Sequence, residues 1–241
     1  MRTKTPNRSN IMPARVAALC VLSGVATLAA AGDLQSHGAP YARMAPVEQY
    51  LMTPDAEVAL ARSAAPAAIS ANAEVLVLTS HGYDTAAKGT NGFTCIVERS
   101  WMAPFDNPEF WNPKLRGPIC YNPAASKSVL QYTLWRSKLA LAGHSRERLL
   151  DETHTALAGK ALPEPLPGAM SYMMSKDGYL ADGQGHWHSH LMFHVPKVEG
   201  ATWGANATGS PVIFDNRDIP EQSIFMVMVG HWSDGSEAPT H

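Results

Sequence analysis

The stretch EVLVLTSHGYDTAAKGTNGFTCIVE, residues 74–98, decides the fold class. Its two ends, residues 74–79 and 92–98, are short runs rich in β-branched and large apolar side chains, which predict two strands. The segment between them is rich in Gly and polar residues and predicts a loop. Two strands therefore follow each other here without a helix between them.

The chain continues with helices and then returns to strands. Asn122 with Pro123 predicts the start of a helix that ends at Gly143, and Ser145 predicts the cap of a second helix that ends at Gly159. A shorter helix is predicted at residues 55–64, and further strands at residues 169–175, 186–195, 211–214 and 223–231. This order, without regular strand–helix alternation, predicts an α+β fold with a mostly antiparallel sheet and flanking helices in a single domain.

The N-terminus predicts a secretory signal peptide over residues 1–31. Residues 1–15 carry four positive charges and no acid, residues 16–28 are almost wholly apolar, and three alanines follow. The apolar run is shorter than the roughly 20 residues that a membrane-spanning helix needs, so cleavage is expected and not anchoring. An uncleaved anchor and a start at Met12 are the alternatives. Residues 32–43 are expected to be disordered, and 44–241 to form the α+β domain.

Composition limits the partners of the mature chain. Removing residues 1–31 leaves fifteen Lys and Arg against twenty-one Asp and Glu, a formal charge of −6. Because nucleic acids and anionic membrane surfaces both bind basic patches, and the mature chain has no Lys/Arg cluster, neither is an expected partner. The remaining 210 residues suffice for one substantial core.

Two of the three cysteines predict a disulfide. Cys20 leaves with the signal peptide, so Cys95 and Cys120 remain. An even pair in an exported protein favours a bond, and export places the protein in the periplasm or outside the cell. Two free thiols are the alternative.

The run GHWHSHLMFHVP, residues 185–196, is the main chemical signal of the sequence. On a strand, successive side chains point to opposite faces. The odd-numbered positions include Leu191 and Phe193 and are predicted to face the core. The other face gathers His186, His188, His190, Met192 and His194.

Histidines at alternate strand positions form a chelating pair. Neighbours on one face are about 6.6 Å apart, so the His188 imidazole can converge with that of His186 or His190 on one ion, but residues four apart cannot. Further ligands must come from other segments, and the sequence predicts His81, Asp84 or His231. Such a site predicts zinc or another divalent transition metal with an open position for water, as in a metal-dependent hydrolase.

Three other interpretations stay open. The histidines can be polar surface or a hydrogen-bonded layer beneath a helix, and Met192 among them keeps copper as a candidate metal. From a different class of function, the protein can be a non-catalytic module that binds a small ligand or a protein. The aromatic segment 100–118 is its predicted binding element.

Four motifs, GTNGFTC (89–95), GPIC (117–120), AMSYMM (169–174) and GHWHSHLMF (185–193), together resemble an uncharacterised family of exported bacterial proteins. The resemblance covers most of the mature chain. It implies export and a shared fold, and it assigns no activity and no functional residue.

Overall fold

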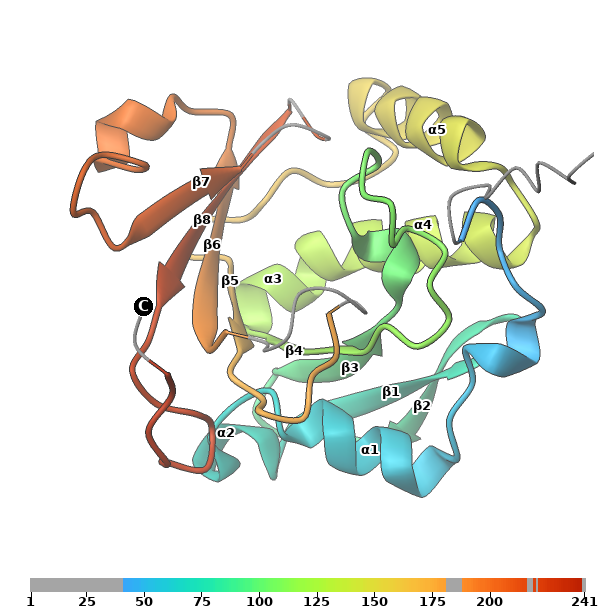
Figure 1. Ribbon diagram of the computed structural model, residues 1–241, viewed down its shortest axis with the longest axis horizontal. Coiled ribbons are helices and arrows are strands. Elements are labelled where there is room, and N and C mark those ends of the chain that lie inside the picture. Colours follow the sequence, from blue (N-terminus) through green and yellow to red (C-terminus); the bar gives the residue numbers. More distant parts are fainter. Residues whose placement is uncertain (1–40, 181–187, 216–218, 220, 240–241) are drawn as a thin grey trace, which may run out of the picture. The chain divides into compact units, whose positions relative to one another are not determined.

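The computed structural model describes residues 41–180, 188–215, 219 and 221–239 (Figure 1). The predicted signal peptide and most of the 32–43 segment lie outside these residues. The part described is a single α+β domain with a mostly antiparallel sheet, as predicted, and the sheet has eight strands. Within it, no helix is long and apolar enough to cross a membrane.

The sheet has the strand order β2-β1-β3-β4-β5-β6-β8-β7. All neighbouring pairs are antiparallel except β1 and β3, which run parallel. The strands are β1 (Glu74–Thr79), β2 (Gly82–Ala87), β3 (Thr94–Glu98), β4 (Gly117–Tyr121), β5 (Met170–Met173), β6 (His190–Pro196), β7 (Val212–Asp215) and β8 (Gln222–Met228). The helices are α1 (Pro54–Arg62), α2 (Ala67–Ser70), α3 (Pro123–Lys127), α4 (Val129–Leu141) and α5 (Arg146–Ala158), with short 3-10 turns η1 (Val47–Gln49), η2 (Ser100–Met102) and η3 (Gly200–Trp203).

Strand β2 lies in the segment predicted as a loop, which is a correction. It pairs with β1 from Thr79↔Gly82 to Val75↔Ala87, and so forms a hairpin. Gly82 has a φ of 146°, which only glycine adopts readily at the start of this strand. As an edge strand with mostly exposed side chains, β2 has no apolar pattern from which a strand could be predicted.

Helix starts follow the predicted caps, but one helix is divided. The Asn122 side chain accepts a hydrogen bond from the Ala125 amide (2.9 Å), and Ser145 accepts one from the Arg148 amide (3.3 Å). The helix predicted up to Gly143 breaks at Ser128, whose φ of −127° and ψ of −77° are not helical. It is therefore present as α3 and α4.

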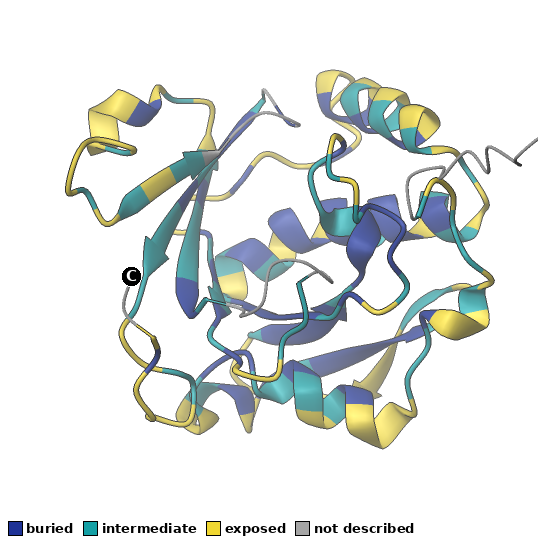
Figure 2. Ribbon diagram, in the orientation of Figure 1, coloured by how far each residue is buried: buried dark blue, intermediate teal, exposed yellow. Residues whose placement is uncertain are grey.

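Alternate residues of the central strands pack against different helices. Val75, Cys95, Val97 and Cys120 belong to the core cluster that contains residues of α1. Leu76, Ile96, Ile119 and Tyr121 belong to the cluster that contains residues of α3 and α4. Figure 2 shows the result, with α4 and the central strands buried and much of α1 and α5 exposed. The sheet is thus covered on both faces.

The aromatic segment after β3 is part of the interior. Trp101, Phe105, Phe110 and Trp111 are all buried, in one cluster with Tyr50. Because these four side chains are covered, they do not form the binding surface that the sequence predicted for residues 100–118. The disulfide that ties this segment at both ends is present, between Cys95 of β3 and Cys120 of β4, which face each other in register.

Candidate functional site

The histidine face of β6 points into the molecule. His190 and His194 are buried, whereas Leu191, Phe193 and Val195 on the other face are half-buried. The odd-numbered face, predicted to be the core face, is covered as well, because Ser189 is buried and Phe225, the cross-strand partner of Phe193, is fully buried. The histidine face lies toward α4, and the other face is covered by η3, whose Trp203 packs against Phe193 and Phe225.

Two of the predicted metal ligands are in contact, through the backbone of one of them. The His190 Nδ1 is 2.6 Å from the carbonyl oxygen of His188, and burial lowers the pKa of His190 while this hydrogen bond opposes the decrease. His186, their predicted partner, lies outside the described residues.

The predicted donors from other segments do not join this pair. His81 and Asp84 are exposed and contact each other across 3.2 Å at the β1–β2 hairpin. Strand β1 is four places from β6 in the sheet, which is about 19 Å at roughly 4.8 Å per strand. The exposed His231 approaches through its backbone, whose carbonyl accepts a hydrogen bond from Ser189 (2.6 Å). The part of the chain that the structure describes contains no group of three metal-ligating side chains, and the metal site stays a prediction.

What the histidine face does line is a cavity of about 290 Å³ between α4 and the sheet. Strands β3, β4, β6 and β8 contribute one wall, and α4 contributes the other. The apolar lining residues are Met102, Pro104, Ile119, Val129, Met192, Ile219, Ile224 and Met226, and the polar ones are Glu98, Tyr121, Tyr132, Thr133, Arg136, His194 and Gln222. Pockets of roughly 300–1,000 Å³ with apolar walls and a few polar groups are typical of small-molecule sites.

The carboxylate of Glu98 marks one polar end of this cavity. Its Oε1 accepts hydrogen bonds from the hydroxyls of Tyr121 (2.6 Å) and Thr133 (3.2 Å). Burial raises the pKa of Glu98, and these two hydrogen bonds oppose that rise because they stabilise the ionised form. Oε2 accepts no hydrogen bond from any described residue. Glu98 therefore keeps an acceptor for a group inside the cavity.

The guanidinium of Arg136 is a buried cation with unused donors. It donates to the Tyr132 hydroxyl (2.6 Å) and to the Ala103 carbonyl (2.6 Å), and it lies 3.8 Å above the centre of the Phe105 ring. Among the described residues, its Nε has no hydrogen-bond partner and no carboxylate forms an ion pair with it. A buried arginine is ordinarily paired, because an uncompensated charge in the interior is costly.

His194 supplies a neutral polar group on the opposite wall. Its Nε2 lies 3.0 Å from the Ser171 hydroxyl, and its Nδ1 has no partner among the described residues. Burial lowers the pKa of His194 to about 4, so the imidazole is uncharged near neutral pH.

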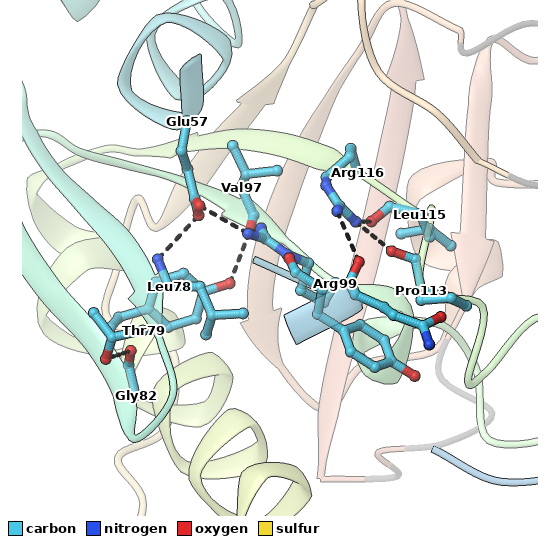
Figure 3. A network of polar contacts seen from close by, with 12 residues as sticks. Glu57, Leu78, Thr79, Gly82, Val97, Arg99, Pro113, Leu115 and Arg116 are labelled. Atoms are coloured by element: carbon cyan, nitrogen blue, oxygen red, sulfur yellow. Dashed lines mark hydrogen bonds and ion pairs between the residues drawn. The ribbon is translucent and has the colours of Figure 1, made fainter. Parts of the chain in front are cut away.

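A second buried polar cluster, around Glu57 and Arg99, is complete in itself (Figure 3). The Glu57 carboxylate pairs with Arg99 (2.8 Å) and accepts the Leu78 amide (3.0 Å). Arg99 also donates to the carbonyls of Tyr50 (2.8 Å) and Val97. The cluster joins α1 to the sheet, and Glu57 and Arg99 neutralise each other, so the role of this pair is structural. Arg116, drawn beside it in Figure 3, donates to the carbonyls of Pro113 and Leu115.

Sequence reasoning did not find the polar groups of the cavity, apart from His194. One signal was present for Arg136, which shares the buried stripe of α4 with Val129, Tyr132, Thr133 and Ala140 at helical spacing. A charge on such a stripe conflicts with a purely apolar core. Glu98, as the last residue of an apolar strand, gave no comparable signal because strand ends are commonly polar.

Comparison of the chain with known protein families, with curated proteins and with solved structures finds no match. The resemblance to exported bacterial proteins stays a prediction. The function therefore has to be argued from the geometry of the cavity.

Proposed function

We propose that the protein is an exported, non-catalytic binding protein for one small, mainly apolar molecule, held in the cavity under α4. The observation that carries the proposal is the cavity itself: about 290 Å³, lined mostly by apolar side chains, with Glu98 and Arg136 keeping unused hydrogen-bonding groups. A core optimised only for stability would fill this space with apolar side chains.

The unused groups favour a ligand because leaving them unpaired is costly. A buried donor or acceptor without a partner destabilises the folded state by about 1–3 kcal/mol. Arg136 and His194 each have one such nitrogen beside the same cavity. A ligand whose polar end lies against Arg136 would satisfy the nitrogen there once the side chains that cover it move, and the sulfur and methyl groups of Met192 and Met226 would adapt to its apolar part.

The test is binding of 1-hexanol and hexanamide, followed by thermal unfolding and calorimetry. We expect both to raise the unfolding midpoint, because a ligand at ten times its Kd stabilises by about 1.4 kcal/mol. Met226→Trp fills the cavity from β8 and should abolish binding. Ala59→Trp on the exposed side of α1, the helix that packs on the other face of the sheet, is the control and should bind as the wild type does. The proposal would be refuted if Met226→Trp bound the two probes as tightly as the wild type, or if the wild type bound neither.

Export is supported by the Cys95–Cys120 disulfide, since such bonds persist mainly in oxidising compartments. We therefore keep the periplasm or the cell exterior as the proposed location.

The hydrolytic metal site is the second candidate, supported by the proximity of His188 and His190. Its test is elemental analysis of untagged protein purified without chelators. About one zinc or copper per chain, lost in His188→Ala, would favour the metal over the binding module.

A further inference from the structure

The charges lining the cavity narrow the class of ligand, on the premise that the proposed function is right. Arg136 is 2% exposed and uses two of the five N–H donors of a guanidinium in hydrogen bonds. One face of the group lies over Phe105, which leaves its edge as the side with unused N–H donors. The N–H groups of that edge form charge-assisted hydrogen bonds with carboxyl oxygens, which are stronger than those with neutral groups.

Glu98 lines the same cavity and is close enough to Arg136 to interact with it electrostatically. Its free Oε2 is an acceptor, so the group placed beside it must donate a proton. A carboxyl group meets both conditions when it shares one proton with Glu98, because one of its oxygens then donates that proton to Oε2 and the other accepts a hydrogen bond from the guanidinium. The two carboxyl groups together carry one negative charge, which Arg136 neutralises.

We infer that the cavity selects a small carboxylic acid with an apolar chain, whose carboxyl group lies between Arg136 and Glu98. The chain then extends along Ile119, Met192 and Met226, which line the same space.

The other titratable groups near Glu98 do not compete for the shared proton. Burial raises the pKa values of Tyr83 and Tyr121, so both hydroxyls stay protonated. His194, with its pKa lowered to about 4, stays neutral, and Arg136 stays charged. Above its solution pKa the ligand is an anion. When it binds, the complex therefore takes up one proton from solution, which lies between the ligand carboxyl group and Glu98.

The test compares hexanoic acid, hexanamide and hexylamine by calorimetry at pH 6, 7 and 8. We expect hexanoic acid to bind at least tenfold more tightly than hexanamide at pH 6, and hexylamine to bind least. The affinity for hexanoic acid should fall as pH rises, by up to about tenfold per unit, because the complex takes up a proton. Hexanamide, which needs no such proton, should show no such fall.

Two variants assign the effect to the named groups. Arg136→Met keeps the length of the side chain and should lower the affinity for hexanoic acid at least tenfold while changing that for hexanamide less than threefold. Arg148→Met on the exposed face of α5 is its control. In Glu98→Gln the amide donates an N–H to the ligand, so the complex no longer takes up a proton and the affinity for hexanoic acid should no longer depend on pH. This variant tests the shared proton even if Arg136→Met does not fold. Equal binding of hexanoic acid and hexanamide would overturn the acid selectivity alone, whereas binding of none of the probes would overturn the binding function itself.

Discussion

At the scale of single residues, the ion pair between Glu57 and Arg99 is the interaction whose loss should cost most. Both side chains are fully buried, so Glu57→Gln leaves a buried guanidinium without its counter-charge. Losses of this kind cost about 3–5 kcal/mol. We expect that decrease in the free energy of unfolding, measured by urea denaturation with the disulfide intact.

The same substitution in an exposed pair is the control. Glu152 pairs with Arg148 one turn away on α5, where both side chains are accessible. Glu152→Gln should cost no more than about 0.5 kcal/mol. Similar costs for the two variants would contradict the structural role assigned to Glu57.

At the scale of an element, β6 makes the stability of the fold depend on pH. Strand β6 turns His194 inward, where burial lowers its pKa to about 4 from the ordinary 6.5. The folded state then binds fewer protons than the unfolded state between these two values. The stability due to the neutral imidazole is complete above pH 6.5 and is lost as pH falls toward 4, by about 3 kcal/mol in total.

We therefore expect the free energy of unfolding of His194→Gln to decrease less between pH 7.5 and 4.5 than that of the wild type. Glutamine can keep the hydrogen bond to Ser171 through its amide, which occupies a position similar to Nε2. His81→Gln on the exposed hairpin is the control and should keep the fall of the wild type. The same pH dependence in His194→Gln and in the wild type would exclude His194 as its source.

At the scale of the whole molecule, the number of free thiols reports both the disulfide and the processing of the chain. The structure joins Cys95 to Cys120, and the predicted cleavage removes Cys20. Protein from an exporting host, unfolded without reductant, should therefore contain no titratable thiol. One thiol per chain would mean that the N-terminal segment is retained, and a second would contradict the disulfide. Intact mass is the independent check on cleavage.

Replacing both bonded cysteines by Ala should destabilise the domain by about 3 kcal/mol, because the bond closes a loop over a sequence separation of 25 residues. The comparison is made by urea denaturation at pH 7. An unchanged unfolding midpoint would show that strand pairing alone holds β3 and β4 together.

Local chemistry was sufficient for much of the fold. The side-chain caps at Asn122 and Ser145 and the apolar runs at residues 74–79 and 94–98 lie where the sequence places them, because caps and buried strands depend on nearby residues. Strand β2 and the break at Ser128 were missed. An exposed edge strand has no pattern of its own, and the Ser128 hydroxyl makes its distant contact with the amide of Leu166.

In the candidate site, too, some features follow from the sequence and others only from distant contacts. The sequence by itself determined the α+β class, the cysteine pair and the alternation that puts His190 and His194 on one face of a strand. Only the tertiary structure decided that this face lies under α4, that His81 and Asp84 are far from it, and that Glu98 and Arg136 line the same cavity. The physical reason is that alternation along a strand fixes which side chains share a face, whereas the layer that covers the face is set by strand order and by helices distant in the chain.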